Sequence, residues 1–170
     1  QGEESILSLM GEDLPDEEFS VLNIEKEAVY RELYAPLLKA VDGFEDLVLE
    51  ARSQGIALAV GTAAPPANVE FTLDGLDLRR HFETVVGATD VARGKPHPDV
   101  FLEAAKRCGA EPANCIVFED APLGVEAARR AGMRVVVITT TLPAAAFAEF
   151  DNVIAIVDDF SDMSIETLFA

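Results

Sequence analysis

Apolar runs that alternate with helical stretches constrain the fold of this chain more than any other feature. The apolar runs, each expected to form a strand, are residues 55–61, 84–86, 115–118, 134–138 and 153–157. Most are apolar at successive positions rather than at every second position, which is typical of strands buried on both faces. Such strands belong to parallel sheets with helices on both sides. The sequence therefore predicts an α/β fold with a Rossmann-like, three-layer parallel sheet.

Helical patterns fill the segments between these runs. Helices are expected at residues 44–53, 67–73, 99–108 and 124–131. Residues 1 to about 38 also have a helical pattern, with a helix that starts near Ser20. The short connection at residues 40–43 is the only candidate boundary between this helical region and the α/β region.

Charge and composition exclude several classes of partner. The chain has 170 residues, 49% of them hydrophobic, which is enough for one full core. Its net charge of −18 argues against nucleic acid and anionic membrane surfaces, because phosphate contacts need clustered cations. No apolar run approaches the ~20 residues of a membrane span, no secretory signal is recognisable, and the two cysteines lack metal-ligand spacing. These features predict a cytoplasmic protein.

Polar residues follow three of the expected strands. Thr62 follows the first strand, Lys95 lies in a Gly-Lys-Pro loop, and Glu119-Asp120 ends the strand at 115–118. Open parallel sheets bind ligands at the carboxyl ends of their strands, so these residues are expected to converge. A lysine could neutralise a phosphoryl group, and adjacent carboxylates could hold Mg²⁺. Thr62 could instead cap a helix, and adjacent acids are common in so acidic a chain.

The order and spacing of these segments resemble the haloacid dehalogenase superfamily, in particular its beta-phosphoglucomutase-like branch. The second family motif matches the strand that ends at Thr62, and the third matches Gly94-Lys95-Pro96. The fourth matches Glu119-Asp120 together with the turn at Gly124. The resemblance implies a magnesium-dependent phosphatase or phosphomutase that acts on a small phosphorylated metabolite such as a sugar phosphate.

The resemblance also implies roles for individual residues. Thr62 and the N–H of Ala63 would hold phosphate oxygens, Lys95 and Thr62 would be catalytic, and Glu119 and Asp120 would bind Mg²⁺. Asn68 and Lys26 would contact substrate, although Asn68 could equally cap its helix and Lys26 could be a solvated surface lysine. Residues 1–40 would form a partial helical cap on a core at 41–170. Glu12-Asp13 stands where mutases of this branch usually have a Ser-Arg pair, which favours a monophosphate phosphatase.

One part of the family pattern is absent from the chain. The first motif, an Asp-x-Asp pair on the first strand, has no match, and the nearest candidate at residues 72–76 has Thr in place of the first aspartate. That strand would lie between the strands ending at Thr62 and Glu119. Three explanations are open: further residues of the natural protein supply it, another chain or a second copy complements the gap, or the two flanking strands pair directly. The chain alone is expected to be inactive, and the alternative function is a non-catalytic binding protein on the same scaffold.

Overall fold

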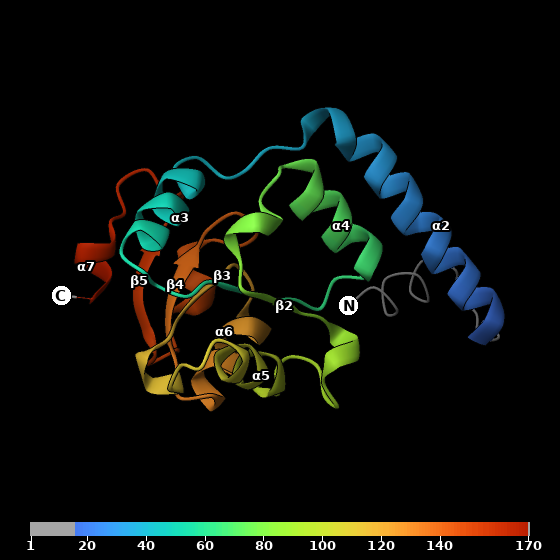
Figure 1. Cartoon of the computed structure of the whole chain (residues 1–170). Coiled ribbons are helices and arrows are strands. Elements are labelled where there is room, and N and C mark those ends of the chain that lie inside the picture. The colour runs from blue at the N-terminus through green and yellow to red at the C-terminus, as the bar shows by residue number, and fades with distance from the viewer. Residues whose placement is uncertain (1–15, 170) are drawn as a thin grey trace.

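The fold has three layers with parallel strands in the middle (Figure 1). The structure is a computed structural model that describes residues 16–169. Helices α5 (Asp99–Arg107) and α6 (Pro122–Arg130) cover one side of the strands. Helices α3 (Phe44–Ser53) and α7 (Ile165–Phe169) cover the other side. The alternation of helices and strands predicted from the sequence is confirmed.

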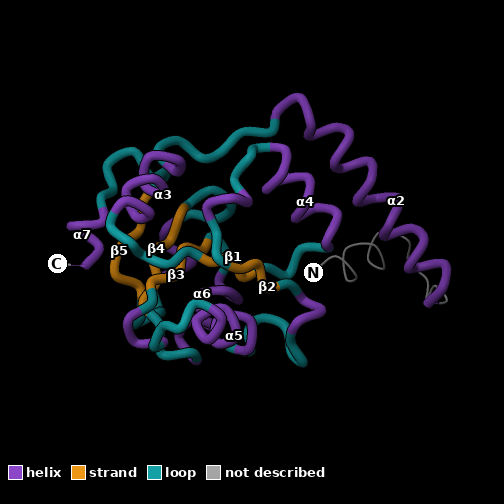
Figure 2. The backbone as a smooth tube through the Cα atoms, viewed as in Figure 1, coloured by secondary structure: helices purple, strands orange, loops and turns teal. Residues whose placement is uncertain are grey.

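The strands form two separate parallel sheets (Figure 2). Strand β1 (Ala59–Gly61) pairs only with β2 (Thr84–Val86), and β3 (Ile116–Glu119), β4 (Arg134–Ile138) and β5 (Val153–Val157) form the second sheet in that order. No strand within residues 16–169 joins β1 to β3. Direct pairing of these two strands, one of the three explanations for the missing motif, is therefore wrong for this structure. An apolar cavity separates their edges instead.

Strand β4 shows how the layers meet. Val135 and Val137 pack into the cluster formed with α5 and α6, whereas Val136 and Ile138 pack into the cluster formed with α3 and α7. Successive side chains of a strand point to opposite faces, so both faces of the sheet are buried at β4. This arrangement confirms the interpretation for the apolar run at 134–138, whereas β5 (Val153–Val157) has exposed residues at alternate positions.

The strand expected at residues 55–61 is shorter in the structure, which places β1 at Ala59–Gly61. The reason lies in the preceding helix. The N–H of Ile56 donates to the carbonyl of Ala51 (3.0 Å) in a turn that Gly55, with φ of +72°, closes at the end of α3. Leu58 donates its N–H to the Glu83 carboxylate (2.8 Å) rather than to a strand. The apolar run therefore includes a helix cap before the strand starts.

Helix α2 (Asp16–Tyr34) lies beside α4 (Pro66–Gly75) and is joined to α3 by a short 3₁₀ turn and an extended segment (Figure 1). It starts before Ser20, the start expected from the sequence, and α6 starts at Pro122 rather than near Gly124. Proline fits a first helical turn because it has no N–H to leave unpaired. The 3₁₀ helices are η1 (Ala35–Leu37), η2 (Arg79–His81), η3 (Ala88–Asp90), η4 (Pro112–Asn114) and η5 (Ala144–Phe147). Within residues 16–169, no helix combines the length and apolarity needed to cross a bilayer.

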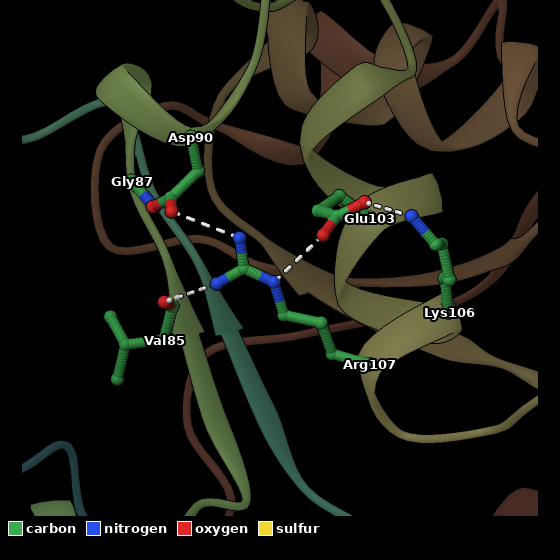
Figure 3. Close-up of polar contacts among 6 residues, drawn as sticks. All are labelled: Val85, Gly87, Asp90, Glu103, Lys106 and Arg107. Atoms are coloured by element: carbon green, nitrogen blue, oxygen red, sulfur yellow. Dashed lines mark hydrogen bonds and ion pairs between the residues drawn. The ribbon is translucent and has the colours of Figure 1, made fainter.

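Arg107, at the end of α5, anchors the segment that follows β2 (Figure 3). Its guanidinium donates to the Asp90 carboxylate (2.9 Å), to Glu103 (2.8 Å) and to the Val85 carbonyl (3.5 Å). The Asp90 carboxylate also accepts from the N–H of Gly87 (2.8 Å). That backbone donor, followed by Arg107, lowers the pKa of Asp90 below its ordinary value. The network fixes the start of the loop that carries Lys95.

Candidate functional site

Lys95 and Glu119 meet, although the strands that precede Lys95 and contain Glu119, β2 and β3, belong to separate sheets. Lys95 lies in the loop between β2 and α5, and Glu119 is the last residue of β3. The lysine Nζ forms an ion pair with Glu119 Oε1, and the two side chains are 18% and 9% exposed. The same Nζ lies 4.8 Å from the centre of the Phe101 ring, where a cation is attracted to the aromatic face. The structure thus brings together two residues that the sequence predicted to converge.

Backbone donors hold the Glu119 carboxylate in place. Its Oε2 accepts hydrogen bonds from the N–H groups of Asp120 (3.1 Å) and Ala121 (3.3 Å), just before α6 begins. A Cβ added to Gly124 would lie 2.0 Å from Glu119 Cδ, so only glycine leaves room for this carboxylate. From the sequence, Gly124 was expected only to form a turn, and its steric role was not predicted. A glycine in the first turn of a helix, five residues after an acid, is the signal that could have indicated it.

Asp120 faces a different set of partners. Its Oδ2 accepts hydrogen bonds from the hydroxyl of Thr140 (3.3 Å) and from that of Thr141. Both threonines lie just beyond the end of β4 at Ile138, a position similar to the one that made Thr62 a candidate. The rule that polar residues gather at the carboxyl ends of parallel strands could therefore have found them.

The two adjacent carboxylates offer a limited magnesium site. Mg²⁺ prefers oxygen ligands and commonly binds one or two carboxylates together with waters and substrate phosphates. Glu119 and Asp120 provide oxygen donors of that kind, but Glu119 already pairs with Lys95. Within residues 16–169, no group of three or more metal-ligating side chains comes together. The chemistry of these donors fits Mg²⁺, with two protein carboxylates and other ligands from solvent or substrate.

Thr62 lies at the end of β1 and fixes the turn into α4. Its N–H donates to the Val86 carbonyl (2.9 Å), and its hydroxyl oxygen accepts from the N–H of Ala64 (3.0 Å). The alternative that the sequence left open, a helix cap, is not what the structure shows, because Pro65 is the N-cap of α4 and Thr62 bonds within the turn before it. The hydroxyl proton remains free to donate to another acceptor, because a hydroxyl can donate and accept together. Within the described part of the chain, no hydrogen bond connects Thr62 to Lys95 or Glu119.

Asn68 and Lys26 belong to a second polar cluster, between α2 and α4. Arg31 donates to Asn68 Oδ1 (2.7 Å), Asn68 donates to Glu27 Oε2 (2.6 Å), and Lys26 pairs with Glu27 Oε1 (2.8 Å). The hydrogen bond from Lys26, followed by that from Asn68, lowers the pKa of Glu27. Among residues 16–169, no hydrogen bond or ion pair links this cluster to the Lys95–Glu119 pair.

Glu27 and Arg31 were not among the residues singled out from the sequence. They stand four positions apart on α2, the spacing at which opposite charges share one helix face, and that spacing was the available signal. Their common partner Asn68 lies on a different helix, which spacing within α2 could not indicate.

Comparison with known proteins shows which family this arrangement belongs to. A family model described as haloacid dehalogenase-like hydrolase matches residues 3–132. A validoxylamine A 7'-phosphate phosphatase of Streptomyces hygroscopicus subsp. limoneus is 39% identical over 116 residues, which cover 68% of this chain and 54% of the relative. Fructose-1-phosphate phosphatase YqaB of Escherichia coli is 50% identical over 76 residues, 45% of this chain and 40% of the relative.

Solved structures show the same fold. A HAD hydrolase of family IA, variant 3, from Entamoeba histolytica superimposes with a TM-score of 0.88 at 24% identity, over 99% of this chain and 77% of the other. A beta-phosphoglucomutase from Clostridium difficile superimposes with a TM-score of 0.81 at 25% identity, over 97% of this chain and 72% of the other. The chain spans about half the length of the two curated relatives described above.

Proposed function

Because the chain belongs to the haloacid dehalogenase-like hydrolases, we propose that its site binds phosphate monoesters of small metabolites, in a protein that hydrolyses them with Mg²⁺. The observation that carries this proposal is the Lys95–Glu119 pair, with Asp120 beside it. A cation and two carboxylates at the carboxyl edge of a parallel sheet can hold a phosphoryl group and its metal together. We assign residues 1–40 to a partial cap over this edge.

In the proposed complex, Lys95 faces both Glu119 and the phosphoryl group. A phosphate oxygen would accept from Lys95 Nζ, which has three donor protons and uses one on Glu119. Glu119 and Asp120 would hold Mg²⁺, which when bound neutralises charge on the phosphate. Thr62 would donate its free hydroxyl proton, and Ala63 its N–H, to two other phosphate oxygens. Asn68 and Lys26 would contact the remainder of the substrate.

The names of the two curated relatives support a phosphatase rather than a mutase. One is named for validoxylamine A 7'-phosphate and the other for fructose 1-phosphate, so both names describe a phosphatase of a small phosphorylated molecule. We propose the same class of substrate for the protein described here. Glu12-Asp13, whose sequence also favours a monophosphate substrate, lies outside the described residues.

We also propose that the 170-residue chain alone binds phosphate without turning it over. Phosphoryl transfer through a covalent intermediate needs a nucleophile in line with the phosphorus. Glu119 is held by Lys95 and two backbone donors, and Asp120 is held by two threonine hydroxyls. These contacts leave the two site carboxylates as binding groups. The alternative function, a non-catalytic phosphate-binding protein, has the same support until turnover is measured.

Two assays on the purified 170-residue chain test the proposal. Calorimetry with fructose 1-phosphate in Mg²⁺ should detect binding that weakens at least ~10-fold in Lys95→Ala, because one charge-assisted contact is worth about 1.5–3 kcal/mol. Lys106→Ala, on the exposed side of α5, is the matched control and should bind like the unchanged chain. Circular dichroism would verify that both variants are folded.

The second assay measures phosphate release from fructose 1-phosphate and p-nitrophenyl phosphate. We expect rates near the background. Turnover near ~10 per second that disappears in Lys95→Ala would contradict the proposed inactivity of the chain. Equal substrate affinity in Lys95→Ala and the unchanged chain would contradict the proposed phosphate site.

A further inference from the structure

The loop that carries Lys95 has little backbone support of its own. It joins η3 to α5 through residues 91–98. Between these residues, all of which the structure describes, a single backbone hydrogen bond forms, from the N–H of His97 to the carbonyl of Gly94 (3.0 Å). A Cβ added to Gly94 would meet no atom within 4 Å, so close packing does not fix the loop there either. The position of Lys95 therefore depends on side-chain contacts.

An ion pair between Arg93 and Asp99 spans this loop. Arg93 Nε donates to Asp99 Oδ2 (3.1 Å), and Nη2 donates to Oδ1 (2.8 Å). Two parallel hydrogen bonds fix the orientation of the two groups as well as their distance, because the planar guanidinium matches the carboxylate. The Asp99 side chain is 18% exposed, and its hydrogen bonds with Arg93 lower its pKa below the ordinary value. The pair thus joins the two residues that flank the segment 94–98.

The start of α5 connects this ion pair to Lys95. Asp99 is the first residue of α5, and Phe101 lies in the same turn of the helix. The N–H of Phe101 donates to the carbonyl of Pro98 (3.1 Å), which ties the end of the loop to that turn. The Phe101 ring in turn lies 4.8 Å from Lys95 Nζ. The arginine network of Figure 3 fixes the start of the same loop, so the pair at Asp99 supplies the second fixed point.

We propose that Arg93 and Asp99 are positioning residues: their ion pair holds the loop so that Lys95 can reach a phosphoryl group. This inference rests on the proposed phosphate site, in which Lys95 Nζ also pairs with Glu119. Within the described part of the chain, no hydrogen bond joins Arg93 or Asp99 to Lys95. The effect of the ion pair therefore passes through the backbone of the loop and through the first turn of α5.

A direct attraction between Arg93 and phosphate is the competing explanation, because the Arg93 side chain is 59% exposed. Asp99 separates the two explanations by the sign of the effect. Asp99→Asn removes one negative charge, and in a chain with a net charge of −18 this change alone would strengthen the binding of an anion. Positioning predicts weaker binding, because a neutral amide cannot hold the guanidinium through two charge-assisted hydrogen bonds.

Phosphate affinity provides the first test, on the 170-residue chain with fructose 1-phosphate and Mg²⁺. Calorimetry should show binding that is at least ~5-fold weaker in Asp99→Asn and in Arg93→Ala, because a displaced Lys95 loses its contact with the phosphate. Two variants are used because Asp99 also begins α5, and circular dichroism verifies that each is folded. The matched control is Asp74→Asn, which removes the same charge and breaks a pair of the same geometry with Arg79 (2.6 and 3.0 Å). It should bind at least as tightly as the unchanged chain.

Acetylation of lysines provides a second test that needs no phosphate. The Lys95 side chain is 18% exposed and paired with Glu119. Mass spectrometry after treatment with an acetyl succinimidyl ester should show Lys95 modified at least ~3-fold faster in Asp99→Asn than in the unchanged chain, because the loop opens more often. Lys106, with a side chain 78% exposed, is the internal reference and should react equally in both. An ion pair that only stabilised the fold would leave the rate at Lys95 unchanged in a folded variant.

Two results would overturn the inference. One is phosphate binding in folded Asp99→Asn that equals or exceeds that of the unchanged chain, and the other is an unchanged acetylation rate at Lys95. Equal phosphate affinity of Lys95→Ala and the unchanged chain would instead contradict the phosphate site itself. The acetylation rates would then decide separately whether the ion pair positions Lys95.

Discussion

The two sheets are built from similar apolar sequences, yet their strands differ in burial. In β4, the side chains of Val135, Val136 and Val137 are fully buried. In β1, Ala59 is exposed and Val60 is only half-buried. The difference lies in their neighbours, because β4 has a paired strand on both edges and β1 has one on a single edge. The comparison of β4 with β1 therefore shows that an apolar sequence alone does not determine how deeply a parallel strand is buried.

Two glycines with positive φ offer the largest test of this contrast. Gly43 (φ +77°) contacts the segment that follows β5, and a Cβ there would lie 2.4 Å from the Phe160 carbonyl carbon. Gly55 (φ +72°) precedes β1 and has open space around it. We expect Gly43→Ala to lower the free energy of unfolding by about 3 kcal/mol or more, since strain and a backbone clash add. Gly55→Ala should cost only the ~1–2 kcal/mol of a left-handed alanine.

Urea denaturation of the two alanine variants provides the measurement. Equal losses would mean that the segments near β5 and β1 are packed equally tightly, contrary to the structure.

Valine truncation compares the strands themselves. Val136→Ala in β4 should lower the free energy of unfolding by about 2–3 kcal/mol, because two methyl groups are lost and a cavity remains. Val60→Ala in β1 should cost less than ~1.5 kcal/mol, because that side chain is half-buried and borders an existing cavity. Chemical denaturation checks both values. A loss at Val60 as large as that at Val136 would show that β1 is packed on both edges in solution.

The bounds of strands and helices were predictable where the apolar pattern of the sequence coincides with the backbone hydrogen bonding. The expected strands at 84–86, 134–138 and 153–157 and the helix at 44–53 are found with the same bounds. The run at 55–61 was misjudged, because Ile56 and Leu58 are as apolar as strand residues while their N–H groups donate to a helix end and to a side chain. The periodicity of apolar residues indicates which side chains are buried. It does not indicate which backbone groups form hydrogen bonds with a neighbouring strand.

The Lys95–Glu119 pair links the loop after β2 to the end of β3. Its removal should lower the free energy of unfolding by an intermediate amount. Lys95→Ala leaves the carboxylate of Glu119, which is 9% exposed, without its cation. We expect a loss of about 1–2 kcal/mol, below the value for a fully buried pair because two backbone N–H groups still bind Glu119. The control Lys106→Ala, with a side chain 78% exposed, should change stability by less than ~0.5 kcal/mol. Thermal unfolding of both variants would show whether the pair joins the two regions.

The smallest expected change in stability is that of Glu27→Gln, at a residue that lies outside both sheets. Its pKa is lowered by Lys26 and Asn68, so its carboxylate stabilises the folded chain above its ordinary pKa of 4.5, and this contribution is lost as the pH falls through the lowered value. Glu27→Gln should therefore remove less than ~1 kcal/mol at pH 7 and make stability less dependent on pH below 4.5. Denaturation at pH 7 and pH 3 measures both. A variant that loses as much stability on acidification as the unchanged chain would contradict this role.

The site was predictable in its location more than in its contacts. Lys95, Glu119 and Asp120 were expected together because each follows a strand or precedes a helix at one sheet edge. Their partners come from distant segments: Thr140 and Thr141 bind Asp120, whereas the sequence assigned both carboxylates to Mg²⁺. Such contacts depend on how far apart the strand ends lie in the fold. The local sequence pattern around each residue does not indicate that distance.

Amide hydrogen exchange on the unmodified chain most directly tests the claim that β1 has one unpaired edge. The account predicts that the Val136 amide, in a strand paired on both edges, is among the most protected in the chain, with exchange that requires global unfolding. The amides of Ala59 and Gly61, which face the cavity, should exchange at least ~100-fold faster than that of Val136. Protection of Ala59 and Gly61 equal to that of Val136 would contradict the account, because it would mean that a partner already occupies the free edge of β1.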